Sequence, residues 1–360
     1  MNNKAITNAK RLCDTMMRCF PDAKDLPLEG KFFYHQGVFL LGMLHIYELC
    51  GEEKYYAYVT SWVDSLVQED GRIDGLCRDW LDYIQPGILL FPLYKLSGNE
   101  KYKKALKTLI EILRSWKKNE SGGFWHANCH PNQMWLDSLY MAGPIQAQFG
   151  AEFGETQFLD EATKQTIIMY DHMVDPVTGL MFHAWDESKK ADWSNKETGL
   201  SSTIWGRAQG WYVMAILDIL SFLPDAHPNR TNLIKIEHTL LSRIMEYRDE
   251  KTKLWYQVLD KGRDPDNWLE TSCSCLFTAA IAKAIRMGVL ENSYTTFANQ
   301  SFEALCDSLD EEGDNLLINR VCVGTCVCNY QEYLNRPTLE NDLHGVGTFL
   351  LMCAEIAQSN

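Results

Sequence analysis

The carboxyl group in this sequence that is best placed to act in catalysis is that of Asp137. It follows Met134, Trp135 and Leu136 at the start of an apolar stretch. Burial among such side chains disfavours a charged carboxylate and raises its pKa. A general acid that works near neutral pH needs a raised pKa of this kind. The sequence therefore predicts that Asp137 is a proton donor, with a helix cap or a hydrogen-bonded buried carboxylate as the alternative.

A second carboxyl group, that of Asp82, lies at the start of the preceding apolar stretch. Neighbouring helices pack about 10 Å apart, so Asp82 and Asp137 could face one another across a cavity. Two nearby carboxyl groups push one pKa upward, which favours one proton donor and one ionised partner. Helix capping and pairing with Arg78 are the alternatives for Asp82 and for its neighbour Asp79.

Arg207 lies between Trp205 and Trp211 at the start of another apolar stretch. A guanidinium group binds a carboxylate through two parallel hydrogen bonds, and tryptophan rings stack on sugar rings, so these residues suit an acidic sugar. Cation–π packing in the protein interior is the alternative. His126 and His183 lie in turn-rich segments that precede two of the apolar stretches.

Five of the twelve cysteines form two close groups, Cys273 and Cys275 in one segment and Cys322, Cys326 and Cys328 in another. Four thiolates could bind zinc, but structural zinc sites usually have two to four residues between paired cysteines. Small buried side chains are the favoured interpretation. We expect no metal. The sequence contains no Walker loop, dinucleotide fingerprint or HExxH motif, and we expect no cofactor.

The elements that position these residues are predicted by an internal repeat. The segment YELCGEEKY, which contains Gly51, recurs as YKLSGNEKY around Gly98. Each copy joins an apolar helix to an amphipathic one through a helix-ending glycine. Such a repeat indicates stacked helical hairpins.

Extending the repeat predicts two series of helices, which alternate along the chain. The apolar series covers 35–49, 82–96, 135–149, 205–222, 270–287 and 342–357. The amphipathic series covers 4–19, 53–68, 100–117, 156–173, 230–247 and 293–309. Six pairs without a linker predict an all-α protein, a single (α/α)6 barrel over residues 1–360, rather than an open solenoid. The candidate residues gather where the apolar helices begin, so the mouth of the barrel is the predicted site.

Composition restricts the partners. The chain has a net charge of −14, and 12% of its residues are aromatic, including eleven tryptophans. This charge argues against nucleic acid and anionic membranes, which need a basic surface. No signal peptide or membrane-spanning run is visible, and the scattered cysteines are typical of reduced thiols. We therefore expect a cytoplasmic protein; the sequence predicts no oligomeric state.

Five motifs together resemble glycoside hydrolase family 105, the unsaturated rhamnogalacturonyl hydrolases, which are related to the unsaturated glucuronyl hydrolases of family 88. They are MWLDSLYMA at 134–142, HAWD at 183–186, WGRAQGW at 205–211, NWLETS at 267–272 and NDLHGVG at 341–347. The resemblance implies that Asp137 is the general acid/base and Asp82 the second essential carboxylate. It implies a substrate-binding set, which consists of His126, Met134, Trp135, His183, Trp205, Arg207 and Trp211.

The resemblance also implies a reaction. Enzymes of this family protonate C4 of a 4,5-unsaturated uronic acid, water adds at C5, and the opened sugar releases its aglycone without a cofactor. The implied substrate is a small anionic oligosaccharide made by a polysaccharide lyase, such as the unsaturated rhamnogalacturonan disaccharide. Unsaturated glucuronyl compounds from another polysaccharide are the nearest rival substrates. A sugar epimerase on the same barrel and a barrel that only binds sugars are the rival functions.

Overall fold

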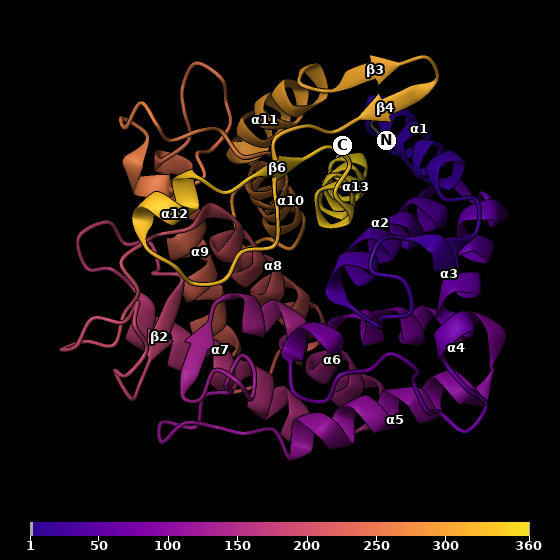
Figure 1. The fold of residues 1–360 in the computed structure, drawn as a ribbon, viewed down its shortest axis with the longest axis horizontal. Coiled ribbons are helices and arrows are strands. Elements are labelled where there is room, and N and C mark those ends of the chain that lie inside the picture. Colours follow the sequence, from indigo (N-terminus) through magenta and orange to yellow (C-terminus); the bar gives the residue numbers. More distant parts are fainter. Residues whose placement is uncertain (1–2, 360) are drawn as a thin grey trace.

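The computed structural model describes residues 3–359, in which two concentric rings of helices alternate along the chain (Figure 1). The inner ring consists of α2 (Tyr34–Cys50), α4 (Leu90–Ser97), α6 (Asp137–Phe153), α8 (Gly206–Phe222), α10 (Thr271–Arg286) and α13 (Leu343–Gln358). The outer ring consists of α1 (Asn3–Cys19), α3 (Glu53–Leu66), α5 (Glu100–Arg114), α7 (Gln157–Met173), α9 (Arg230–Glu246) and α11 (Thr295–Asp307). Because α13 packs against both α10 and α2, the ring is closed. The predicted (α/α)6 barrel is confirmed, and the open solenoid is excluded.

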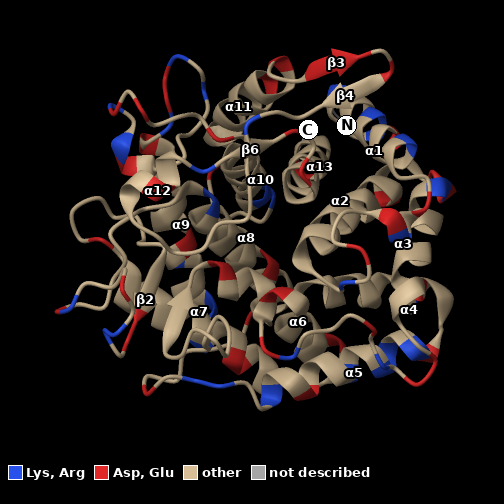
Figure 2. Cartoon of the chain, in the orientation of Figure 1, with Lys and Arg blue, Asp and Glu red and all other residues tan. Residues whose placement is uncertain are grey.

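Side-chain patterning explains the two rings. The inner helix α8 buries apolar side chains on all sides, whereas the outer helix α5 buries one stripe that includes Leu106, Leu109 and Leu113. A helix that is apolar all round must be surrounded by other helices, and one with a single stripe covers a core. Figure 2 shows the same division, with charged residues chiefly on the outer helices and loops.

Glycines end the first inner helices as the repeat predicts. Gly51, Gly98 and Gly154 adopt left-handed φ angles of 70°, 68° and 74° directly after α2, α4 and α6. Glycine reaches this conformation without the steric cost that a Cβ atom brings. Each turn leads directly into an outer helix, so this end of the barrel carries only short connections.

The second inner helix differs from its prediction over 82–96. Residues Leu81–Tyr83 and Gln85–Leu89 form 3-10 turns, and the α-helix begins only at Leu90. Pro86 lacks the backbone N–H that an α-helix interior would use. The backbone of Gly37 also approaches this segment so closely that a Cβ atom there would lie 2.0 Å from Gln85 Oε1. The 3-10 turns place Asp82 at the mouth of the barrel.

Short antiparallel strands tie the connecting segments together. Strand β1 (Gln133–Trp135) pairs with β2 (Ala184–Asp186), and β5 (Val321–Cys322) pairs with β6 (Thr338–Leu339). A third pair, β3 (Asp310–Glu312) and β4 (Asn315–Leu317), packs beside α1. A five-residue helix, α12 (Tyr330–Leu334), lies between β5 and β6. These pairings fix long segments at the end of the barrel where the inner helices begin.

Two further observations concern the chain as a whole. All twelve cysteines have free thiols. Between residues 3 and 359, no helix combines the length and the apolar character needed to cross a bilayer.

Candidate active site

A cavity of about 210 Å³ opens at the mouth of the barrel. It is lined by Phe33, Tyr34, His35, Trp80, Asp82, His126, Trp135, Asp137, Met141, Trp205, Gly324, Thr325 and Cys326. Most of these positions lie at or just before the beginnings of inner helices, and the last three come from the loop after β5. The cavity therefore brings the two candidate carboxyl groups together with several aromatic rings.

Asp82 is the protonated member of the carboxyl pair. Its side chain is buried, and no hydrogen bond from another described residue stabilises its charge. Burial and the negative charge of Asp137 raise the pKa of Asp82 well above its ordinary value. Of the two carboxyl groups, that of Asp82 therefore favours the protonated form.

His126 provides Asp82 with a neutral neighbour. Its Nε2 lies 3.6 Å from Asp82 Oδ1 but accepts a hydrogen bond from Trp80 Nε1 at 3.0 Å. Its Nδ1 lies 2.9 Å from Ser138 Oγ, so Nδ1 carries the ring proton. Burial lowers the pKa of His126 to about 3, and the Trp135 ring stacks on it at a centroid distance of 4.1 Å. His126 is thus a neutral part of the cavity wall that these contacts hold in place, and it does not donate a proton to Asp82.

Asp137 is the ionised member of the pair. Burial is the largest single influence and would raise the pKa of Asp137. The 3.0 Å hydrogen bond between His183 Nε2 and Asp137 Oδ2, together with the electrostatic influence of His183 and His126, lowers the pKa overall. The sequence predicts a raised pKa for Asp137, and that prediction is wrong. The raised pKa belongs to Asp82, because Asp82 has no donor comparable to His183.

The imidazole of His183 is itself held on both sides. It is fully buried, and its Nδ1 lies 2.5 Å from the hydroxyl group of Tyr333 in α12. The Trp205 ring packs beside it, with centroids 4.8 Å apart. A chain of polar contacts therefore runs from Tyr333 through His183 to Asp137.

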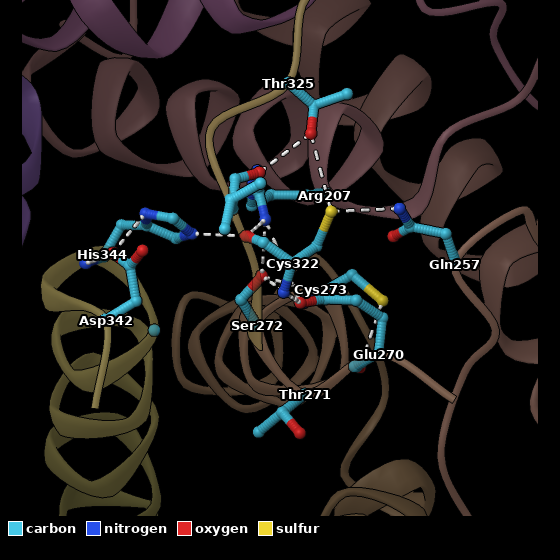
Figure 3. A network of polar contacts seen from close by, with 12 residues as sticks. Arg207, Gln257, Glu270, Thr271, Ser272, Cys273, Cys322, Thr325, Asp342 and His344 are labelled. Atoms are coloured by element: carbon cyan, nitrogen blue, oxygen red, sulfur yellow. Dashed lines mark hydrogen bonds and ion pairs between the residues drawn. The ribbon is translucent and has the colours of Figure 1, made fainter. Parts of the chain in front are cut away.

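Arg207 supports the cavity wall from behind. Its Nη1 and Nη2 donate to the backbone carbonyl oxygens of Cys322 and Val323, at 2.5 and 2.7 Å (Figure 3). Its guanidinium also lies 4.4 Å from the centroid of the Trp205 ring. The side chain is buried and does not line the cavity. In this structure its guanidinium holds the strand that leads into the loop after β5, and its role as a carboxylate clamp stays a prediction.

Glu270 completes this support (Figure 3). Its carboxylate accepts hydrogen bonds from the backbone N–H groups of Cys273 in α10 and Cys322 in β5, at 2.6 and 2.9 Å. It also lies 3.9 Å from Arg207 Nη1. The side chain is fully buried, so this buried charge is balanced by directed donors and by a guanidinium.

The remaining predicted substrate-binding residues lie at different depths. Trp135, Trp205 and His126 line the cavity, whereas Met134 and Trp211 do not. Met134 fills space against Gly123, where a Cβ atom would lie 2.0 Å from the Met134 sulfur. Trp211 lies deeper in the barrel against Tyr140, with ring centroids 4.6 Å apart.

Several wall residues were not predicted from the sequence. They are Phe33, Tyr34, Trp80, Gly324 and Thr325. Tyr333, which contacts His183 but does not line the cavity, was not predicted either. The aromatic residues before α2 and the 3-10 turns could have been found, because they precede inner helices as the predicted residues do. The loop after β5 carries no periodic pattern that would place it over the cavity.

One group of described residues could hold a metal ion. The ligand atoms of His35, Asp342 and His344 lie within 4.8 Å of one another beside the cavity. Asp342 Oδ1 lies 2.9 Å from His344 Nδ1 and 3.5 Å from His35 Nδ1. Burial lowers the pKa of His35 to about 3, so its imidazole is neutral. Among residues 3–359, the two cysteine groups do not form such a cluster.

Comparisons with known proteins identify the family of this chain. A family model described as Glycosyl Hydrolase Family 88 matches residues 8–360. The structure of a family 105 glycoside hydrolase from C. acetobutylicum ATCC 824 is 34% identical with a TM-score of 0.93, covering 97% of this chain and 99% of that one. The unsaturated rhamnogalacturonyl hydrolase YesR of Bacillus subtilis (strain 168) is 27% identical, covering 90% of this chain and 89% of YesR.

A more distant structure shares the fold. The unsaturated glucuronyl hydrolase from Bacillus sp. GL1 is 16% identical with a TM-score of 0.73, covering 98% of this chain and 96% of that one. The matches to the family 88 model and to the family 105 enzyme both run along nearly the whole chain. This chain therefore belongs to glycoside hydrolase family 105, a family of glycosidases related to family 88.

Proposed function

We propose that the protein removes a terminal 4,5-unsaturated uronic acid from a lyase-generated oligosaccharide, with unsaturated rhamnogalacturonan disaccharide as its main substrate. The observation that carries the proposal is a pair of buried carboxyl groups on one cavity, of which Asp137 has a hydrogen bond from His183 and Asp82 has no comparable donor. Hydration of a vinyl ether needs both an acid that gives a proton to carbon and a base that takes one from water. The name of YesR supports this choice of substrate.

In the proposed reaction, Asp82 supplies the proton that adds to C4 of the sugar. Water adds to C5 and passes a proton to Asp137, which leaves a hemiketal at C5. The hemiketal opens to a 5-keto group, and C1 then releases the aglycone as an alcohol. This assignment gives the proton donation to Asp82, whereas the sequence resemblance implies Asp137. Asp137 keeps an acid/base role, because the proton that it takes from water must pass to Asp82 to restore the starting state of the pair.

The cavity suits a planar anionic sugar. The Trp135 and Trp205 rings provide flat apolar walls, and the buried positive charge of Arg207 stands directly behind Trp205. A buried charge acts over a longer range than an exposed one because solvent screens it less. Glu270, 3.9 Å from Arg207, offsets part of this charge, so the flat apolar walls carry most of the fit to the sugar.

A sulfated rhamnose aglycone is the second candidate. The unsaturated 3S-rhamnoglycuronyl hydrolase of Formosa agariphila is 27% identical over 184 residues, covering 50% of this chain and 48% of that protein. Unsaturated glucuronyl compounds rank below it as substrates, and sugar binding without turnover ranks last. We also propose that the protein acts in the cytoplasm on imported oligosaccharides, which the twelve free thiols support.

The test follows the near-ultraviolet absorbance of the conjugated double bond in each candidate disaccharide. We expect the wild type to remove this absorbance fastest with the rhamnogalacturonan disaccharide, and Asp82→Asn and Asp137→Asn to abolish the loss while still binding substrate. Asp79→Asn is the matched control, because Asp79 is exposed and its carboxylate bonds to Asn128 at the rim. Persistent absorbance with every disaccharide would refute hydrolysis, and faster turnover of a sulfated compound would refute the choice of aglycone.

A further inference from the structure

The short helix α12 places one phenol beside the residues that hold the carboxyl pair. Tyr333 is fully buried, and its hydroxyl lies 2.5 Å from His183 Nδ1. The helix is held by a capping box between Asn329 and Glu332. The backbone carbonyl of Tyr333 accepts a hydrogen bond from Gln257 Nε2 at 3.2 Å. Tyr333 is therefore fixed at both its backbone and its hydroxyl.

The contacts determine where the protons lie. Because Asp137 is ionised, it can only accept, so His183 Nε2 must carry the proton in their 3.0 Å hydrogen bond. At the other nitrogen, the Tyr333 O–H is the donor that points to His183 Nδ1, 2.5 Å away, and Nδ1 is then the acceptor. Burial raises the pKa of Tyr333 well above its ordinary value, so the phenol retains this proton. The Tyr333 oxygen in turn accepts from the Cys328 backbone N–H at 3.4 Å.

We propose that Tyr333 is a positioning residue that fixes the proton of His183 on Nε2 and, through it, holds Asp137 as the anionic member of the carboxyl pair. This inference rests on the proposed function for its kinetic consequences but not for its structural ones. An imidazole has two neutral tautomers, and the partner of one nitrogen decides which nitrogen carries the proton. Without the Tyr333 hydroxyl, His183 is free to turn an unprotonated nitrogen toward Asp137.

Tyr333→Phe tests the proposal while keeping the ring. The phenyl ring would still pack beside His183 and Trp205, whose centroids each lie 5.9 Å from that of Tyr333. The matched control is Tyr330→Phe in the same helix, which removes a hydroxyl bonded to Asp264 Oδ2 at 2.6 Å, away from the cavity. Each variant loses the hydrogen bond that one buried or half-buried phenol donates. Only Tyr333→Phe removes a contact to His183.

The first measurement is the pH dependence of kcat/KM with the best unsaturated disaccharide. For Tyr333→Phe we expect about a tenfold loss at neutral pH, with the acidic limb moved upward by about one pH unit, because Asp137 loses part of the hydrogen bonding that stabilises its charge. Tyr330→Phe should retain the wild-type profile. A uniform loss in Tyr333→Phe at all pH values, with the acidic limb unmoved, would refute the positioning role.

The second measurement needs no substrate. Nitrogen NMR of the histidine-labelled wild type, assigned with His183→Gln, should show His183 protonated on Nε2 and accepting a hydrogen bond at Nδ1. Protonation on Nδ1 would overturn the proposal even if the enzyme is active. Conversely, an inactive wild type with the expected spectrum would refute the proposed function and leave the Tyr333 contact intact.

Discussion

Replacing Glu270 with Gln is expected to destabilise the wall of the cavity from a position outside it. Both carboxylate oxygens of Glu270 act only as acceptors, Oε2 toward the Cys273 N–H and Oε1 toward the Cys322 N–H. The Ser272 hydroxyl lies 2.8 Å from each of them. The amide of Gln has only one acceptor oxygen, so its NH2 group would face one of the two backbone donors.

The size of the effect follows from these contacts. A hydrogen bond to a charged group contributes about 1.5–3 kcal/mol, and breaking a buried ion pair costs about 3–5 kcal/mol. Since the substitution weakens one such bond and removes the charge near Arg207, we expect a loss of about 4 kcal/mol in the free energy of unfolding. Unfolding entropy is about 2.1 cal/mol/K per residue, so a 360-residue chain loses about 5 °C in Tm.

Differential scanning calorimetry of Glu270→Gln beside the wild type measures this loss. Glu340→Gln serves as the control, because Glu340 is an exposed carboxylate immediately after β6. Since Cys322 leads into the loop that lines the cavity, KM should rise more than kcat falls. A Tm within about 1 °C of the wild type would refute the claim that Glu270 pins β5 to α10.

Three further predictions concern pH and metal ions. The pH profile of kcat/KM should be bell-shaped, falling in acid as Asp137 is protonated and in alkali as Asp82 ionises. Because the pKa of Asp137 is lowered and that of Asp82 is raised, the plateau between the two limbs should be broad. A rate that does not fall in alkali would contradict a proton on Asp82. Burial lowers the pKa of His126 to about 3, so its stabilising contribution is complete above about pH 6.5, its unfolded pKa, and is lost as the pH falls toward 3. Melting curves of His126→Gln should show that Tm depends less steeply on pH in this range than in the wild type. An unchanged slope would exclude His126 as a source of the pH dependence of stability. Treatment with a chelator should leave kcat/KM unchanged, because no proposed step uses the histidine–aspartate–histidine cluster beside the cavity; loss of activity restored by zinc would contradict this.

The helices could be predicted because their sequence patterns act locally. A helix with apolar side chains on all sides belongs to the inner ring, and a helix with a single apolar stripe belongs to the outer ring. Glycines such as Gly51 and Gly98 mark where the inner helices end. The start of the second inner helix was less predictable. There Pro86 and the close approach of Gly37 from α2 favour 3-10 turns, and the second of these causes comes from a distant part of the chain.

The site could be predicted as a location more readily than as a set of contacts. Helix starts place Asp82, Asp137 and Trp205 at the mouth of the barrel, and the sequence indicates this. The protonation of the carboxyl pair depends on His183, which lies in a different segment from both, and on Tyr333, which lies 150 positions further along the chain. No spacing rule connects those residues, because their contact is created only when the ring closes.

The glycine turns that end α2, α4 and α6 have a practical consequence for anyone who wishes to observe this protein at work. An inner helix such as α2 has 17 residues and is about 25 Å long, so these turns lie about that far from the cavity. They contribute nothing to its wall, and Leu96 beside Gly98 is 56% exposed. A fluorophore or surface tether attached there would leave the mouth of the barrel unobstructed for substrate entry and product exit.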